Sequence, residues 1–140
     1  MKVGIINGPN LNMLGVREPG VYGDLSLKKM INQIRENHPS IEVLDFQSND
    51  EGELISKIQE WGISIEAIII NPGGYSHTSV AIRDAISSII APVIEVHISN
   101  IHSREEFRHT TITGGACKAV ISGLGVEGYS VALNHLFRSR

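Results

Sequence analysis

The chain has 140 residues, of which 41% are hydrophobic and 19% are charged. This composition supports one packed core and excludes a disordered chain. The formal charge of −3 argues against duplex nucleic acid or an anionic membrane as the main partner. We therefore expect a single domain over residues 1–140.

The one cysteine, Cys117, leaves no internal disulfide, so we expect a reducing compartment and a cytoplasmic protein. The N-terminus has too short an apolar run for a signal peptide, and no apolar stretch is long enough to span a bilayer. Aromatic residues make up only 5% of the chain. The core must therefore be largely aliphatic, which suits a parallel sheet buried on both faces.

Short runs rich in Ile and Val alternate with segments of helical periodicity along the chain. The runs are expected to form strands at residues 2–7, 41–46, 65–71, 92–98 and 118–122. The apolar faces of the four expected helices contain Leu27, Met30, Ile31 and Ile34; Leu54, Ile55, Ile58 and Trp61; Ile82, Ala85, Ile86 and Ile89; and Tyr129, Ala132, Leu133 and Leu136. The expected N-caps and helix ends are Ser26, Asn49, Ser76 or Thr78, Gly62 and Pro92.

Strands that alternate with helices at this spacing pair in parallel through right-handed crossovers. We therefore predict an α/β fold, a flavodoxin-like three-layer sandwich with a five-stranded parallel sheet in the order 2-1-3-4-5. The connection from Gly8 to Asp24 is unusually long for a compact domain, and loops of that length usually carry function.

Polar residues follow three of the predicted strands where each strand ends. Asn7 and Asn10 follow the first strand, Asn71 ends the third, and Glu95 and His97 close the fourth. The carboxyl ends of parallel strands form the usual ligand site of such a sheet. Because Glu95 and His97 are two residues apart, their side chains leave the same face of the strand. A carboxylate beside an imidazole orients the ring and favours its protonated form, as a general acid requires.

Each of these segments also has a structural interpretation. Residues 7–10 (NGPN) are typical of a turn, and His97 of a hydrogen-bonded core histidine. Residues 71–77 (NPGGYSH) resemble a phosphate-binding loop, but the P-loop and dinucleotide-binding motifs are absent. Residues 104–108 (REEFR) are typical of a solvated helical turn with side chains paired four residues apart.

The positions of the metal-ligating side chains and of the lysines argue against a metal site and against an imine intermediate. Glu95, His97 and His102 have metal-ligating side chains, but their spacing matches no metal motif. Lys118 lies near the start of a predicted strand, away from the polar strand ends, and the other lysines lie at a strand start or on predicted helix surfaces, which argues against an imine. In the long loop, Tyr22 is a candidate base whose phenolate Arg17 would stabilise, and otherwise a residue that packs the loop. The remaining amides, imidazoles and arginines suit a polyhydroxylated carboxylate as ligand.

Six segments together resemble the type II 3-dehydroquinate dehydratases. They are INGPN (6–10), REPGVYG (17–23), NPGG (71–74), HTSVAIRDA (77–85), EVHISN (95–100) and REEFRH (104–109), and with GLGVEGY (123–129) they span nearly the whole chain. The resemblance implies a single catalytic domain that dehydrates 3-dehydroquinate to 3-dehydroshikimate without a cofactor or metal. It places this reaction in the shikimate pathway to aromatic compounds or in quinate catabolism.

The resemblance also implies the role of each catalytic residue in an anti elimination through an enolate. Tyr22 would abstract the proton beside the ketone, and Arg17 would keep that tyrosine reactive. Asn10 would help hold the water that stabilises the enolate oxygen. His97, assisted by Glu95, would then protonate the departing hydroxyl.

Substrate-binding positions are implied in the same way, at Asn71, His77, Asp84, Ile98, Ser99 and Arg108. Ile98 and Ser99 would offer backbone amides to the substrate carboxylate, and Asp84 would reach the site of a neighbouring subunit. Family members assemble as dodecamers of trimers, so a homo-oligomer is implied. Two features depart from the family pattern: Thr111 stands in a run where relatives usually have Ser, and Gly114 is followed by a second glycine.

A non-catalytic, flavodoxin-like module that binds a small molecule is the alternative. A receiver-type domain would carry acidic residues where Asn7 and Asn71 stand. A flavin carrier would need aromatic residues to enclose the ring, and Tyr22 is the single aromatic residue in the long loop after the first strand. Both versions of the alternative therefore fit the sequence less well.

Overall fold

The computed structural model describes residues 1–16 and 25–140. Five parallel strands form one sheet in the order β2-β1-β3-β4-β5, which confirms the predicted topology. The strands are β1 (Lys2–Asn7), β2 (Glu42–Gln47), β3 (Ala67–Asn71), β4 (Val93–His97) and β5 (Ala119–Ser122), each within two residues of its predicted bounds.

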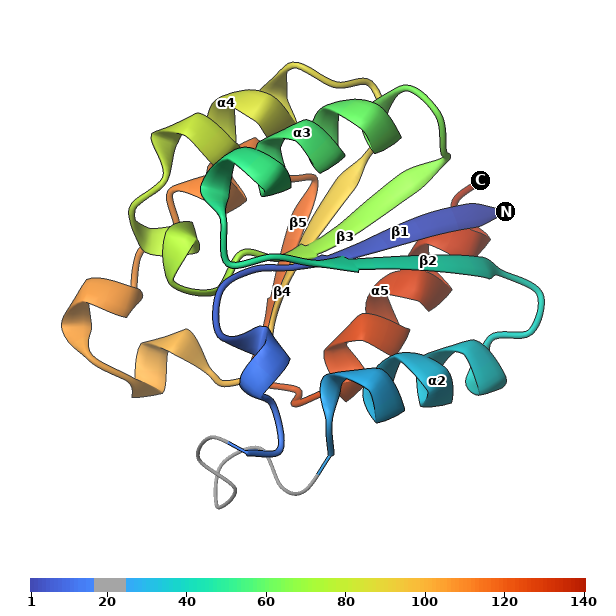
Figure 1. Cartoon of the computed structure of the whole chain (residues 1–140), viewed down its shortest axis with the longest axis horizontal. Coiled ribbons are helices and arrows are strands. Elements are labelled where there is room, and N and C mark those ends of the chain that lie inside the picture. The colour runs from blue at the N-terminus through green and yellow to red at the C-terminus, as the bar shows by residue number, and fades with distance from the viewer. Residues whose placement is uncertain (17–24) are drawn as a thin grey trace.

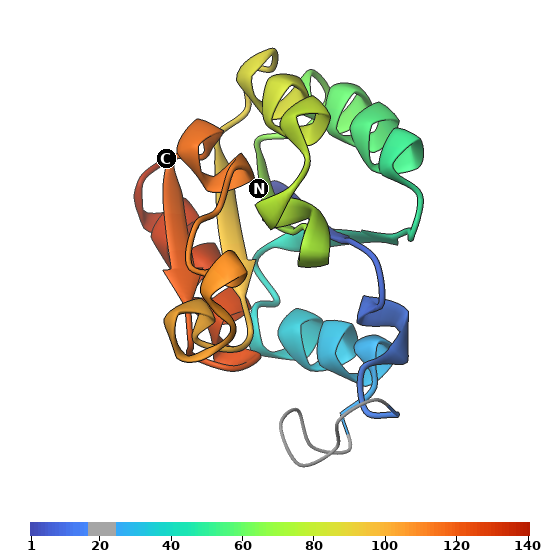
Figure 2. The same cartoon turned by 90° about the vertical axis from the view of Figure 1, so that its left-hand side faces the viewer.

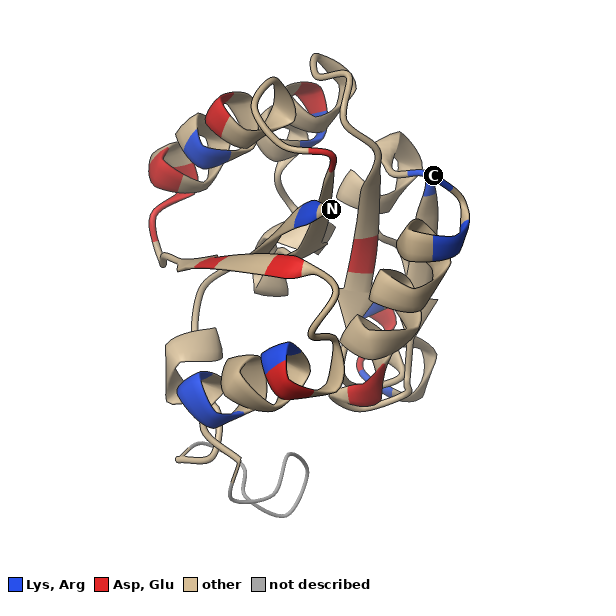
Figure 3. Ribbon diagram, turned by 90° about the vertical axis from the view of Figure 1, so that its right-hand side faces the viewer, with Lys and Arg blue, Asp and Glu red and all other residues tan. Residues whose placement is uncertain are grey.

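Helices cover both faces of this sheet, as a flavodoxin-like sandwich requires. Figure 1 shows α2 (Leu27–Asn37) and α5 (Glu127–Arg138) on one face and α3 (Glu51–Gly62) and α4 (Val80–Ser87) on the other. Acidic and basic residues are interspersed along α2 and α3 (Figure 3). Among the described residues, none of the helices combines the length and the hydropathy that a membrane-spanning helix requires.

The strand residues alternate between two hydrophobic clusters, one on each face of the sheet. Ile5 and Ile69 pack in the cluster beneath α2 and α5. Their neighbours Ile6 and Ile70 pack in the cluster beneath α3 and α4. All four side chains are fully buried, because successive side chains of a strand point to opposite faces and both faces are covered by helices.

The caps of the first two long helices match the predictions in part. Ser26 caps α2 by accepting a hydrogen bond from the Lys29 N–H, as predicted. The N-cap of α3 is Asp50, so the prediction of Asn49 was wrong. Asn49 is one residue too early, and its side chain accepts a backbone N–H from the loop after β1 instead. The helix ends at Gly62, as predicted.

Helix α4 differs from its prediction at both ends. Ser79 is its N-cap, and neither Ser76 nor Thr78 takes that role. Ser76 lies inside the short helix Gly73–His77 that precedes α4, too far from the first turn of α4 to cap it, and its hydroxyl donates to the Gly73 carbonyl. The helix ends at Ser87, and the chain then turns before β4, so Pro92 does not mark its end. A local sequence pattern does not show which of several neighbouring Ser and Thr residues is the N-cap, because helix ends vary by one or two residues.

Helix α5 is joined to the sheet by a buried tyrosine. The Tyr129 hydroxyl donates to Asn7 Oδ1 at 2.6 Å and lies 3.2 Å from Asn71 Nδ2, which donates to it. Asn7 and Asn71 are the last residues of β1 and β3, so one hydroxyl connects two strand ends. Burial raises the pKa of Tyr129 well above its ordinary value.

Replacing Tyr129 by Phe removes this hydroxyl from between two buried amides. We expect the free energy of unfolding at pH 8 to fall by about 1–3 kcal/mol, because both amides lose a buried partner. At pH 11 the free energy of unfolding of wild type falls by about 1.4 kcal/mol more than that of the variant, so the difference between them narrows. The reason is that Tyr129 ionises near pH 10 in the unfolded chain and stays neutral when buried. Urea unfolding at both pH values measures the two effects.

The control for this measurement is Tyr75→Phe, because Tyr75 is only half-buried and its hydroxyl donates to a single backbone carbonyl. A stability difference between wild type and Tyr129→Phe that stays the same from pH 8 to pH 11 contradicts the assignment of Tyr129 as a buried neutral group.

Candidate active site

A pocket lies at the carboxyl ends of β1, β3 and β4, the edge that faces the viewer in Figure 2. Its walls come from the loop after β1, the loop after β3 and the segment after β4. The lining residues are Pro9, Asn10, Leu11, Met13, Leu14, Asn71, Gly73, Gly74, His77, His97, Ile98, Ser99, Ile101, Arg104 and Arg108. The polar residues predicted to converge at this edge are thus brought together.

Asn10 lies in this pocket in an unusual backbone conformation. Its φ of 71° falls in the left-handed region, which asparagine tolerates better than most residues. The Asn10 N–H donates to Asn49 Oδ1 at 3.0 Å, and the short helix η1 (Leu11–Met13) follows directly. The conformation is therefore held from outside the loop, which fixes where the chain leaves β1.

The loops after β1 and β3 pack backbone against backbone. The Gly8 N–H donates to the Asn71 carbonyl at 2.8 Å, and a Cβ on Gly8 would lie 2.4 Å from the Pro72 carbonyl oxygen. Gly73 has a φ of 61°, and a Cβ there would lie 2.9 Å from the Pro9 carbonyl oxygen. Only glycine permits this approach and this conformation, so the two loops form one rigid wall of the pocket.

The Asn71 amide is held in one orientation. Its Oδ1 accepts the Gly73 N–H at 3.1 Å, and its Nδ2 donates to the Tyr129 hydroxyl. Next to it, His77 ends the short helix η2 (Gly73–His77), with Nδ1 2.9 Å from the Thr110 carbonyl oxygen. A carbonyl only accepts, so Nδ1 of His77 carries the proton. Both side chains therefore present defined polar groups to a ligand.

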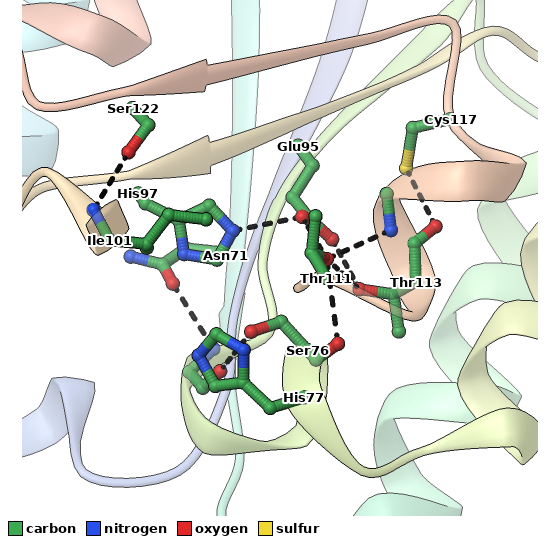
Figure 4. Close-up of polar contacts among 12 residues, drawn as sticks. Asn71, Ser76, His77, Glu95, His97, Ile101, Thr111, Thr113, Cys117 and Ser122 are labelled. Carbon is green, nitrogen blue, oxygen red and sulfur yellow. Dashed lines mark hydrogen bonds and ion pairs between the residues drawn. The ribbon is translucent and has the colours of Figure 1, made fainter. Parts of the chain in front are cut away.

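Glu95 and His97 form a buried pair on β4. Nε2 of His97 lies 2.8 Å from Oε2 of Glu95, and Figure 4 shows the two side chains directed toward each other. Glu95 is 0% exposed and His97 is 6% exposed. The predicted interaction between them is confirmed. Because Nε2 is engaged with the carboxylate, Nδ1 is the ring nitrogen that remains for a ligand in the pocket.

Basic side chains lie on the side of the pocket formed after β4. Arg104 and Arg108 line it, and Nε of Arg108 lies 3.2 Å from Oε2 of Glu105. Hydrogen bonds from the Glu105 backbone and from Arg108 lower the pKa of the Glu105 carboxyl group. Arginines beside backbone amides at Ile98 and Ser99 make this side suited to an anionic group.

The segment of residues 104–108 is helical only in part. A short 3₁₀ helix, η4 (Glu106–Arg108), replaces the expected turn of α-helix. Because a 3₁₀ helix repeats every three residues, Arg108 pairs with Glu105 three positions earlier and not four. This geometry leaves Arg104 and Arg108 at the pocket.

The sequence analysis did not predict the apolar side of the pocket. Leu11, Met13 and Leu14 form this side, and apolar residues in a loop give no recognisable signal of a binding site.

Of the predicted site residues that the structure describes, Glu95 and Asp84 do not line this pocket, and Glu95 lies behind His97. Asp84 is exposed on α4 and does not line the pocket of its own chain. Arg17 and Tyr22 lie outside the described residues, so their roles remain predictions.

Cys117 lies close enough to Glu95 to feel its charge but does not line the pocket. Burial, together with the charge of Glu95, raises the pKa of its thiol to about 12. Within residues 1–16 and 25–140, no three His, Cys, Asp or Glu side chains lie close enough together to hold a metal ion.

The family model for class II dehydroquinases matches residues 1–137 of this chain. The 3-dehydroquinate dehydratase of Aliarcobacter butzleri is 50% identical over 135 residues, which cover 95% of this chain and 82% of that protein. The catabolic 3-dehydroquinase 1 of Fusarium vanettenii is 50% identical over 137 residues, which cover 96% of this chain and 95% of that protein.

Solved structures agree with these sequence relatives. The crystal structure of a type II dehydroquinase from Butyrivibrio crossotus matches with a TM-score of 0.94 and 48% identity, over 98% of this chain and 97% of that chain. The type II dehydroquinase from Propionibacterium acnes matches with a TM-score of 0.93 and 37% identity, over 96% of this chain and 94% of that chain. The fold and between 37% and 50% of the aligned residues are shared with these proteins, and this chain belongs to the class II dehydroquinase family.

Proposed function

We propose that this protein dehydrates 3-dehydroquinate to 3-dehydroshikimate, acting as a single catalytic domain over residues 1–140. The observation that carries the proposal is the buried Glu95–His97 pair at a pocket with arginines on one side. A pair of this kind supplies an oriented acid, and the arginines suit a carboxylate substrate. The matching relatives are named as dehydratases of this substrate, and no observation favours the non-catalytic module.

The first step of the proposed reaction is removal of the proton beside the ketone. Tyr22 is the proposed base, and Arg17 is proposed to keep its phenolate accessible at neutral pH. The resulting enolate needs a hydrogen-bond donor near its oxygen. Asn10 lines the pocket with its backbone fixed by Asn49, which supports the proposal that it holds a water molecule at that oxygen.

The second step is departure of the hydroxyl group as water. His97 is the proposed general acid, because it lines the pocket while Glu95 holds its Nε2. A proton on Nδ1 then passes to the leaving oxygen, and the enolate electrons form the new double bond. The acid and the proposed base come from different elements, β4 and the loop after β1, which suits an anti elimination.

Substrate binding is proposed to use groups on both sides of the acid. Asn71 and His77 would bind hydroxyl groups, since their polar atoms are oriented by the surrounding backbone. The backbone amides of Ile98 and Ser99, together with Arg108, would bind the carboxylate, and all three residues line the pocket. No cofactor or metal is proposed to take part.

The experiment that tests the function follows absorbance during incubation of chelator-treated protein with 3-dehydroquinate. The product is a conjugated enone and the substrate is not, so turnover raises the ultraviolet absorbance. We expect a rise without added metal or cofactor that is insensitive to borohydride, because no imine forms. Folded protein that produces no rise rejects the proposed function.

Deleting the gene tests whether the reaction serves the shikimate pathway or quinate catabolism. A new requirement for aromatic amino acids indicates the shikimate pathway.

Two variants separate the two steps of the reaction. Tyr22→Phe is expected to lose both turnover and exchange of the substrate's acidic hydrogen with solvent, because the base is gone. His97→Ala is expected to lose turnover by about 10²–10⁴-fold while exchange continues, because only the acid is gone. Exchange is measured by NMR in D₂O, and His102→Ala, an exposed histidine outside the pocket, is the control. Parallel loss of both processes in His97→Ala contradicts its role as the acid.

A homo-oligomer, a dodecamer of trimers, is proposed as the working assembly in the cytoplasm. The exposed position of Asp84 on α4, away from its own pocket, supports the proposal that it serves a neighbouring subunit. Asp84→Ala and His97→Ala should each have low activity. Co-expressed, they should recover activity above either parent, since some sites then combine an intact Asp84 with an intact His97. Mixed assemblies, verified by mass spectrometry, that recover nothing contradict a shared site.

A further inference from the structure

The Glu95 carboxylate has partners that the reaction described above does not use. Besides His97, two threonine hydroxyls contact it, one from Thr111 and one from Thr113. Thr113 is the first residue of the short helix η5 (Thr113–Ala116), which follows η4 along the chain. Figure 4 shows both threonines next to Glu95, on the side away from His97.

The hydrogen-bond geometry of Thr111 defines the direction of its hydroxyl proton. Thr111 Oγ1 accepts the Gly114 N–H at 3.0 Å, and it lies 2.6 Å from Oε2 of Glu95. A backbone N–H can only donate, so the hydroxyl accepts from Gly114. Its one proton goes to the Glu95 carboxylate and not to the Ser76 carbonyl oxygen at 3.4 Å, because the carboxylate is nearer and charged. Oε2 therefore accepts from Thr111 and from His97 together.

Thr113 occupies the other oxygen of the same carboxylate. Its hydroxyl donates to Oε1 of Glu95, and the Thr113 side chain is fully buried. With Thr113 on Oε1 and with Thr111 and His97 on Oε2, both carboxylate oxygens have partners and the plane of the carboxylate is defined. A rotation of Glu95 that released His97 would break the threonine bonds as well.

The chain between the two threonines is held at both sides. Nη1 of Arg83, on α4, donates to the Ile112 carbonyl at 2.8 Å. The Ile112 N–H donates to the Ser76 carbonyl at 2.7 Å. The threonines are therefore presented to Glu95 by a segment fixed to α4 and to η2. Gly114 lies close by, and a Cβ there would be 3.0 Å from Oε2 of Glu95, so its lack of a side chain leaves the carboxylate in place.

We propose that Thr111 and Thr113 are positioning residues that hold the Glu95 carboxylate in the orientation that fixes the ring of His97. This inference rests on the proposed function for its effect on catalysis. Neither threonine lines the pocket. They act through Glu95, so they serve the elimination step and leave proton abstraction by the loop after β1 unaffected.

The test compares a Thr111→Val/Thr113→Val variant with a Thr111→Ser/Thr113→Ser variant. Valine keeps the shape of threonine and removes the hydroxyl, whereas serine keeps the hydroxyl. We expect elimination of 3-dehydroquinate to slow about 10- to 100-fold in the valine variant, because hydrogen bonds to a charged group are lost. Exchange of the acidic hydrogen should stay close to wild type, and the serine variant should restore elimination. Thr78→Val, an exposed threonine, is the control.

A second measurement needs no substrate and so separates this inference from the proposed function. In ¹⁵N-histidine NMR, the Nε2–H signal of His97 is assigned by its loss in His97→Ala. This signal should be protected from solvent in wild type and in the serine variant, and it should shift and lose protection in the valine variant. An unchanged signal overturns the inference, even if wild type has no activity toward 3-dehydroquinate.

The kinetic outcomes decide between positioning and mere support of the fold. Equal loss of exchange and elimination in the valine variant, or no loss of either, overturns the inference. A rise in the ratio of exchange to elimination together with the changed NMR signal supports it. Should the double valine variant fail to fold, Thr113→Val compared with Thr113→Ser provides the same two readouts.

Discussion

The organisation of this protein depends on a carboxylate buried in the centre of an aliphatic sheet. Glu95 is on β4 with no exposed surface, where an unpartnered charge would be very costly. The chain meets this constraint with three side chains, from His97 on β4, from Thr111 before η5 and from Thr113 at the start of η5. Because those partners must all be in place, the position of His97 and the packing of η5 against the sheet are linked.

A second polar network performs a similar task at the other strand ends. The Tyr129 hydroxyl joins the terminal asparagines of β1 and β3, and Asn71 in turn accepts the Gly73 N–H. Within the described ranges, every buried side-chain nitrogen and oxygen has a hydrogen-bond partner. Rigid polar groups at a pocket lose little freedom when a ligand binds, so such networks favour both binding and catalysis.

The pocket separates its chemical tasks by structural element. β4 carries the proposed acid, His97, on a strand that is buried and paired on both sides, so its position is well defined. The proposed base belongs to the loop after β1, and the arginines belong to the segment after β4. A rigid acid combined with groups on loops is a common arrangement in open α/β sheets, since the strand ends fix the chemistry and the loops adapt to the substrate.

Local patterns in the sequence were sufficient for much of this protein. Parallel pairing followed from alternating strands and helices, and the chosen strand order was confirmed. The Glu95–His97 contact followed from a spacing of two residues on a strand, which places both side chains on one face. The family motifs added the roles of the remaining candidate residues. These features depend on periodicity and on neighbours in the chain, which a sequence displays directly.

Only the tertiary structure determined which distant residues complete the site. Tyr129 and Asn7 are separated by 122 positions, and Thr113 and Glu95 by 18, so no periodicity relates them. Tertiary contacts also determined which residue caps α3. The Asn49 side chain accepts a hydrogen bond from the loop after β1, and Asp50 is the N-cap of the helix. The sequence by itself determined which strand ends carry polar side chains. Packing between the elements determined which hydroxyl and amide groups orient those side chains, because these contacts form only when the helices and the sheet have assembled.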